Sequence, residues 1–148
     1  MKAKIILGPT KRGTKTENSE YYFHISSNTT NGKICIYEAI FINPRKNINL
    51  HYHKILTETF TVLEGEFYFN LDNVEFVLNK NDSVVVPPYV IHGFNAKLPF
   101  SKLQIAFIDS PNRDRFFIEL ARLTNERITL SDAERQAFLN RYDQYEIN

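Results

Sequence analysis

The chain has 148 residues, of which 43% are hydrophobic and 24% are charged, and its formal net charge is +1. These values fit one globular domain with a buried core, and the near-neutral charge gives no reason to expect a nucleic-acid partner. No apolar stretch approaches the length of a signal-peptide core or a membrane span, and the single cysteine, Cys35, excludes an internal disulfide. A cytoplasmic protein without membrane contact is expected, with Cys35 as a small buried hydrophobe.

Short runs rich in β-branched and aromatic residues recur as far as residue 108, with turn residues between them. The predicted strands are Lys4–Leu7, Tyr21–Ser26, Lys33–Ile42, Asn49–His53, Thr59–Leu63, Glu66–Leu71, Val74–Leu78, Asp82–Val86 and Lys102–Ile108. Residues 11–20 are polar without a period and predict a loop, whereas Glu64-Gly65 and Leu71-Asp72-Asn73 predict hairpin turns. Many short strands joined by tight turns predict an all-β sandwich or barrel.

The pattern becomes helical near the C-terminus. Ser110-Pro111 predicts the start of a first helix that turns Phe116 and Phe117 to its apolar side. The run Ser131–Glu134 has a capping-box pattern, which predicts a second helix through about Tyr142. We expect both helices only to cover the outside of the β-domain.

Three of the four histidines and one glutamate have spacings that suit a metal site. His51 and His53 lie on one face of a predicted strand because side chains alternate along it. Glu58 follows after a few loop residues, and His92 would have to come from a different strand pair. Three nitrogens and one oxygen suit Fe, Mn, Ni, Co, Cu or Zn, and leave open positions on an octahedral ion. Each histidine alone is more often structural, as we expect for His24, but the combination favours one divalent transition metal.

The same residues resemble the two motifs of the cupin superfamily. The first motif is similar to His51-x-His53, four residues, Glu58, six residues and Gly65. The second is similar to Pro87, His92 and Asn95 at their spacing in this chain. The two motifs span residues 51–95. The resemblance implies that His51, His53, Glu58 and His92 hold the metal.

Three positions depart from these motifs. Arg45 and Asn81 stand where the first and second motifs open with glycine, and Tyr89 replaces the glycine of the Pro-x-Gly turn. Asparagine accepts a positive φ at little cost. A tyrosine needs an altered turn or accepts strain, which makes the placement of the loop before His92 less secure.

The resemblance implies a fold and an architecture. The expected fold is a double-stranded β-helix, the cupin or jelly-roll barrel, with two short C-terminal α-helices. One cupin domain would span residues 1–148, with its motif core at 48–96 and a helical extension at 110–148. The run Arg115–Leu120 is also similar to the C-terminal part of quercetin-dioxygenase-like cupins.

The resemblance further implies a metal-dependent, dioxygenase-like enzyme acting on a small enolisable or phenolic substrate. Glu58 would be both a metal ligand and the catalytic base, while Phe60 and Phe94 would line an apolar pocket or belong to the barrel core. The alternative is a non-oxidative cupin, either an isomerase or a module that binds a small molecule or sugar at the same metal. A homodimer could form through residues 1–8, although an ordinary edge strand there is equally plausible.

Overall fold

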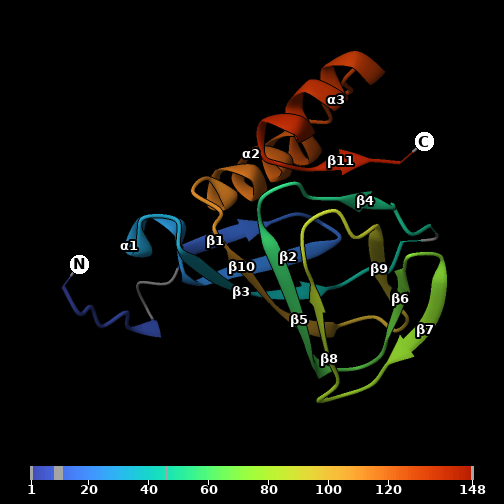
Figure 1. Cartoon of the computed structure of the whole chain (residues 1–148), viewed down its shortest axis with the longest axis horizontal. Coiled ribbons are helices and arrows are strands. Elements are labelled where there is room, and N and C mark those ends of the chain that lie inside the picture. The colour runs from blue at the N-terminus through green and yellow to red at the C-terminus, as the bar shows by residue number, and fades with distance from the viewer. Residues whose placement is uncertain (1, 9–11, 46, 148) are drawn as a thin grey trace.

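The computed structural model describes residues 2–8, 12–45 and 47–147 (Figure 1). Met1, Lys11 and Asn148, which belong to segments assigned above, lie outside the described residues. One sheet has six strands in the order β1 (Arg12–Lys15), β2 (Ser19–Ile25), β3 (Ile34–Phe41), β10 (Ser101–Ile108), β5 (Thr57–Glu64) and β8 (Ser83–Val86). The other has five, in the order β11 (Tyr145–Glu146), β4 (His51–Tyr52), β9 (His92–Ala96), β6 (Phe67–Leu71) and β7 (Val74–Leu78).

The chain passes repeatedly from one sheet to the other. Strands β3, β5, β8 and β10 belong to the six-stranded sheet, whereas β4, β6, β7 and β9 between them in sequence belong to the five-stranded sheet. All strand pairs between neighbours are antiparallel. This alternation is the topology of a jelly-roll barrel, which confirms the predicted fold class.

Alternating side chains of β5 build the barrel core and also place one functional residue in it. Phe60 and Val62 are fully buried, and Glu58 points to the same inner face because it is two residues before Phe60. The Phe60 ring centroid lies 5.0 Å from those of Phe69 and Phe94, which come from the opposite sheet. A carboxylate therefore faces an aromatic interior, where it requires partners.

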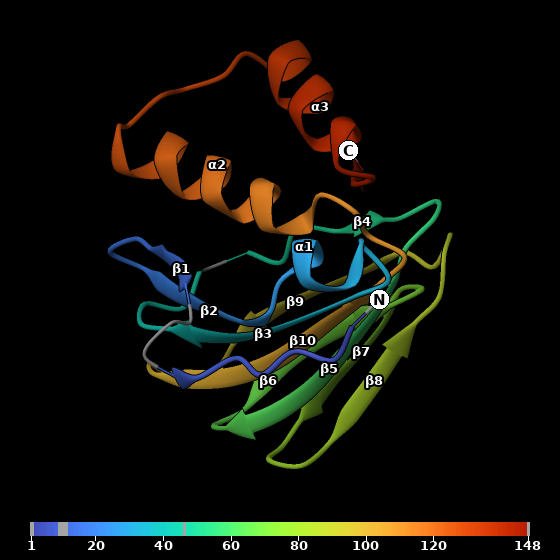
Figure 2. The ribbon, with the colours of Figure 1, turned by 90° about the vertical axis from the view of Figure 1, so that its left-hand side faces the viewer.

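Two longer helices cover one side of the barrel, as Figure 2 shows. They are α2 (Arg113–Asn125) and α3 (Asp132–Arg141); the short helix α1 (Ser27–Thr30) lies between β2 and β3 in sequence. Phe116 of α2 stacks on Phe138 of α3 at 5.7 Å, so the helices share an aromatic layer. The predicted capping box is present, with Ser131 accepting from the Glu134 amide and Glu134 reaching back to Ser131.

The predicted start of the first helix is two residues too early. Ser110 is not its N-cap, because its amide donates to the carbonyl of Gly32 and thereby continues the pairing of β10 with the turn before β3. The helix begins only at Arg113, after Asn112. Because the helix starts later in the chain than predicted, Arg113 is its first residue, and its side chain packs against the barrel.

Four strand assignments differ from the sequence-based ones, among them the short strand β11, which was not predicted. The run Lys4–Leu7 is irregular and mostly exposed, so it does not form the predicted strand. The predicted loop at 11–20 instead contains β1, which pairs with β2 from Gly13 opposite Tyr22 to Lys15 opposite Glu20. Strand β9 was not predicted, since its sequence His-Gly-Phe-Asn-Ala has few strand-favouring residues.

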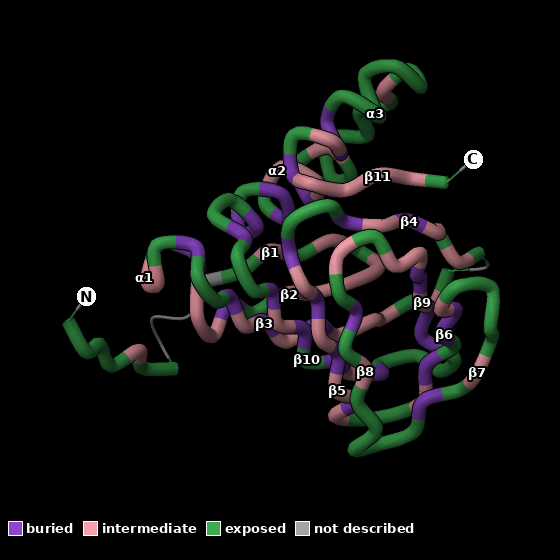
Figure 3. The backbone as a smooth tube through the Cα atoms, in the orientation of Figure 1, coloured by how far each residue is buried: buried purple, intermediate pink, exposed green. Residues whose placement is uncertain are grey.

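Burial follows the two packing layers (Figure 3). Buried residues lie between the sheets and beneath α2 and α3, and Cys35 is fully buried, as predicted. The turns behave as expected: Asp72 and Asn73 both have positive φ, as a two-residue hairpin requires, and Gly65 has a φ of 77°. Across the described residues, no helix is long and apolar enough to cross a membrane. A dimer and a cytoplasmic location stay predictions.

Candidate metal centre

The structure brings together all four residues of the predicted metal site. His51 lies on β4, and its Cα is the register partner of that of His92 at the start of β9. His53 follows β4 by one residue, and Glu58 belongs to β5 in the other sheet. The cluster therefore joins the two sheets inside the barrel. His24 lies outside it and contacts Glu38 at 3.2 Å on the six-stranded sheet, as expected for a structural histidine.

The four side chains are close and buried. One donor atom from each lies within 4.8 Å of the others, and none of the four residues is more than 9% exposed. A Glu58 carboxylate oxygen, Oε2, lies 3.1 Å from Nε2 of His53 and 3.0 Å from Nε2 of His92. The ring of His51 is centred 4.3 Å from that of His92. Three imidazoles and a carboxylate thus converge on one point.

A backbone carbonyl fixes the orientation of each imidazole. Nδ1 of His51 lies 3.2 Å from the carbonyl oxygen of Asn49, and Nδ1 of His92 lies 3.0 Å from that of Val90. His53 makes the same contact with the carbonyl of Asp143. Because a carbonyl only accepts, each Nδ1 carries the proton, and Nε2 is the nitrogen turned to the cluster. Metal-binding histidines are held in this way, so the residues present fit a divalent transition ion.

Electrostatics favour the charge states that such an ion requires at His51 and Glu58, whereas a proton on His92 would have to leave when the ion binds. Burial lowers the pKa of His51 to about 3, so its imidazole is neutral near pH 7. Burial alone would raise the pKa of Glu58, but hydrogen bonds and charge from His53 and His92 outweigh it and hold that pKa well below its usual value. Burial likewise opposes protonation of His92, but the carboxylate of Glu58 prevails and raises the pKa of His92. The cluster could therefore bind a metal ion by exchanging a proton for it.

The loop before His92 accepts backbone strain. Tyr89, at the motif's glycine position, has a φ of 67°, which a residue with a β-carbon adopts at a cost of about 1–2 kcal/mol. Its amide donates to the carbonyl of His53 at 2.7 Å, and its exposed ring stacks on Tyr52 at 6.3 Å. His92 still reaches the cluster. The turn at Tyr89 therefore has the conformation that usually needs glycine, and His92 keeps its position in the cluster.

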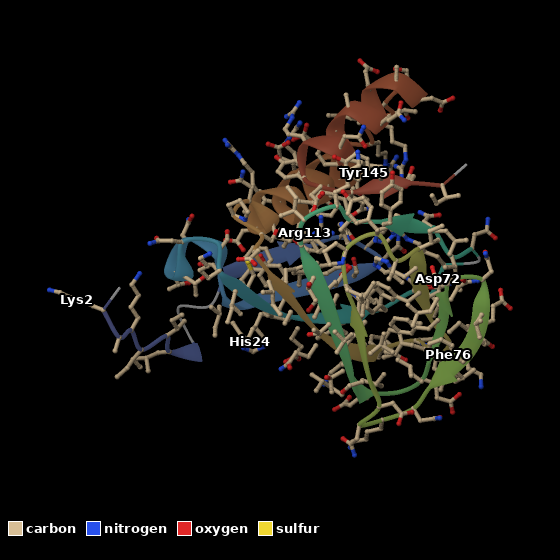
Figure 4. The ribbon with its side chains drawn as sticks, in the orientation of Figure 1. Lys2, His24, Asp72, Phe76, Arg113 and Tyr145 are labelled. Atoms are coloured by element: carbon tan, nitrogen blue, oxygen red, sulfur yellow. The ribbon has the colours of Figure 1, made fainter. Side chains whose placement is uncertain are left out.

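The turn after α3 holds the histidine strand in place. The carboxylate of Asp143 accepts hydrogen bonds from the amides of Lys54, Ile55 and Leu56 at 2.9, 2.9 and 3.0 Å. The backbone carbonyl of the same residue accepts from His53. Strand β11 then pairs with β4, placing Tyr145 beside it (Figure 4). One turn thus organises the segment that connects two members of the cluster.

A second loop is tied down behind His51. The side chain of Asn95 accepts from the amide of Arg45 at 3.1 Å and donates to its carbonyl. Gly93 lets this loop lie against β9, since a β-carbon there would come within 2.8 Å of the Asn49 carbonyl oxygen. That carbonyl is the one that orients His51. The motif residue Asn95 therefore acts on the site through the loop.

A cavity of about 170 Å³ opens onto the cluster from the side of α2. His51 and Glu58 line it, whereas His53 and His92 do not. Its aromatic wall is made by Tyr21, Phe41, Phe94, Phe116 and Phe117. Phe94 thus lines the cavity as predicted, while Phe60 is a core residue, 1% exposed, that packs against it.

The helices contribute to this cavity, so the expectation that they only cover the barrel is wrong. Arg113, at the start of α2, lines the cavity and is 3% exposed (Figure 4). Its two terminal nitrogens donate to the carbonyl of Tyr142 at 3.3 Å and to the side chain of Gln144 at 2.9 Å. The guanidinium also lies 4.1 Å from the ring centroid of Phe116. The pattern Ser110-Pro111 predicted a helix start close to Arg113. No local sequence signal indicated that Arg113 or Asp143 belongs to a site.

Comparisons with known proteins agree with this fold. Residues 40–99 match the cupin domain, which covers every residue of the cluster. A solved RmlC-like cupin from Shewanella frigidimarina is similar with a TM-score of 0.61 and 22% identity, over 78% of this chain and 96% of that chain. A Streptomyces Pac13 variant determined with uridine has a TM-score of 0.59 and 10% identity, over 77% of this chain and 88% of that chain.

A third solved structure is hydroxypropylphosphonic acid epoxidase from S. wedmorenis, with a TM-score of 0.60 and 18% identity. The match covers 72% of this chain and 59% of that chain. No curated protein matches the chain at a significant level. The jelly-roll barrel and its buried histidine–glutamate cluster define a cupin with a possible metal site. Residues 40–99 therefore form a cupin domain, and the chain has the fold of a solved cupin. The narrower likeness to quercetin-dioxygenase-like cupins stays a prediction.

Proposed function

We propose that the protein is a metal-dependent, dioxygenase-like enzyme that acts on a small enolisable or phenolic substrate. The observation that carries the proposal is the set of three imidazoles whose Nδ1 atoms are all held by backbone carbonyls, beside an aromatic cavity. His51, His53, Glu58 and His92 would hold the ion. When bound, the ion would supply Lewis acidity and a coordination position for the substrate oxygen and for dioxygen.

The chain's own residues would prepare the substrate. Glu58 lines the cavity and is ionised, so it can accept the proton of an acidic hydroxyl or of a carbon next to a carbonyl. The rings of Phe94 and Phe117 would hold the apolar part of the substrate and exclude water. His53 and His92 lie behind the cavity wall, so a substrate would approach from the side of His51 and Glu58.

A non-oxidative reaction is the second candidate, because the same ligands serve both. Pac13, which has this fold, is described as a nucleoside dehydratase, whereas the S. wedmorenis enzyme is an epoxidase. A fold that carries both chemistries does not choose between them. Proton transfer by Glu58 with no oxidant would give an isomerase or a dehydratase, and binding without turnover would give a small-molecule module.

Metal content tests the site itself. Elemental analysis of natively purified protein should find about one transition ion per chain, and His51→Ala should abolish its retention. His24→Ala is the matched control, since this histidine lies outside the cluster. Unchanged metal content in His51→Ala would refute the site.

Oxygen dependence tests the reaction. Protein reconstituted with Fe, Mn, Ni, Co or Cu should consume dioxygen with one member of a panel of flavonols, diketones and thiols. The same substrate should not turn over anaerobically. Anaerobic conversion would replace the oxidative proposal by the non-oxidative one, and tightly held Zn would point the same way.

A further inference from the structure

The wall of the cavity carries positive charge that the protein leaves incompletely paired. Arg45 and Arg113 line the cavity, whereas Glu58 is the one carboxylate among its described lining residues. Within the described part of the chain, no carboxylate lies within 4.0 Å of Arg113, and its neighbour Asp114 instead accepts from Ser27 and Tyr37. A buried cation without a partner is costly, so its retention at a cavity needs a reason.

The hydrogen bonds of Arg113 are also incomplete. A guanidinium has five N–H donors, and the protein accepts from one on each terminal nitrogen. Nε is buried and has no acceptor among the described residues. One N–H thus remains on each terminal nitrogen, so two donors are left for an acceptor such as a carboxylate. Phe107, Phe116 and Phe117 surround the group with rings and supply no acceptor oxygen.

Burial lowers the pKa of Arg113, and among the nearby charges the carboxylate of Glu58 opposes this most. A metal ion held by the cluster would neutralise the charge of Glu58. Three neutral imidazoles, one carboxylate and a divalent ion sum to a charge of about +1, and Arg113 adds another positive charge beside it. A loaded site would therefore attract an anion.

We propose that Arg113 is a binding residue for a carboxylate, so that the substrate of this protein is a small organic acid. Its acid group would lie on Arg113, its apolar body against Phe116 and Phe117, and its enolisable or phenolic oxygen toward the cluster. This inference deepens the proposed function and rests on it for the second anchoring point. The contact between carboxylate and guanidinium does not itself need the metal.

Benzoate and benzamide test the inference because they have nearly the same shape and differ in charge. Binding is measured by calorimetry or ligand-detected NMR, on metal-free and Zn²⁺-loaded protein. Benzoate should bind about 10- to 100-fold more tightly than benzamide in both forms, as charge-assisted hydrogen bonds imply. Arg113→Gln should remove this preference, and Arg113→Lys should retain only part of it. Arg115→Gln is the matched control, because Arg115 lies on the same helix with its side chain 75% exposed.

Each outcome decides the question. Equal binding of benzoate and benzamide to the unaltered protein overturns the inference without recourse to any variant. If Arg113→Gln still prefers benzoate, with or without Zn²⁺, another group binds the anion. This result also overturns the inference. Metal content is measured on the same samples. A protein that holds no metal yet prefers benzoate through Arg113 would refute the proposed metal enzyme and leave the carboxylate site standing.

Discussion

Replacing Asp143 by alanine should weaken metal binding about 10- to 100-fold, although Asp143 is not a ligand. Its carboxylate accepts from three successive amides, those of Lys54, Ile55 and Leu56. Its backbone carbonyl orients the imidazole of His53. Without the carboxylate, the segment that joins His53 to Glu58 loses its anchor, and the carbonyl, which alanine keeps, is held less firmly against the imidazole of His53.

The cost in stability follows from the exposure of the three amides. Those of Lys54 and Ile55 are exposed and can bind water instead, so each contributes roughly 0.5 kcal/mol. The amide of Leu56 is partly buried, so the loss of its hydrogen bond would lower the free energy of unfolding by about 1–2 kcal/mol. Asp143→Ala should therefore lower the free energy of unfolding by about 2–3 kcal/mol, before any cost of the backbone conformation.

Asp109→Ala isolates that backbone cost. Asp109 has a φ of 57°, against 59° for Asp143, but it is exposed, and its contact with Lys33 at 3.4 Å contributes little. Guanidinium unfolding of the metal-free proteins gives the stability difference, and competition with a chromogenic chelator gives the Zn²⁺ affinity. Equal Zn²⁺ affinities for the two variants would refute the reasoning, since they would mean that the amide anchor has no effect on the ligands.

Three further outcomes are expected. Asn95→Asp should destabilise the protein by about 2–4 kcal/mol, more than Asn95→Ala does, because its new oxygen would face the carbonyl of Arg45; equal unfolding energies would contradict the assigned amide orientation. Tyr89→Gly should stabilise the protein by roughly 1 kcal/mol by removing the strain at a φ of 67°, and a loss of stability in denaturant would mean that stacking on Tyr52 matters more. Burial raises the pKa of Cys35 to about 11, so its thiol should not react with a disulfide reagent at pH 8 until the protein unfolds, and fast labelling of folded protein would contradict this.

The first three residues of the candidate metal site could be predicted because their determinants are local. The alternation of His51 and His53 on a strand fixes their common face, and Glu58 shares the inner face of its strand with Phe60. His92 was identified by a motif and not by its strand, since β9 has few strand-favouring residues and forms through its partners β4 and β6. For Tyr89 the sequence left open either an altered turn or a strained one, and its positive φ shows that the turn is strained.

The residues that the sequence did not reveal depend on contacts between distant segments. His53 and Asp143 are 90 residues apart, and no pattern along the chain links an imidazole to a carbonyl at that separation. Arg113 begins an amphipathic helix, where an arginine is normally exposed, and only the position of the helix start turns it into the barrel. Such residues become predictable when the packing of α2 and α3 is known.

These distant contacts make the C-terminal turn part of the site. Tyr142 and Gln144 accept from Arg113, and Asp143 between them accepts from His53 and from the loop before Glu58. The guanidinium and the imidazole therefore depend on the same three residues. Coupling of this kind is reciprocal: whatever free energy the docked turn adds to metal or anion binding, the bound metal or anion must add to the docking of the turn. Binding at the barrel cluster should thus order the turn after α3. A change that loosens this turn should weaken the binding of both the metal and the anion.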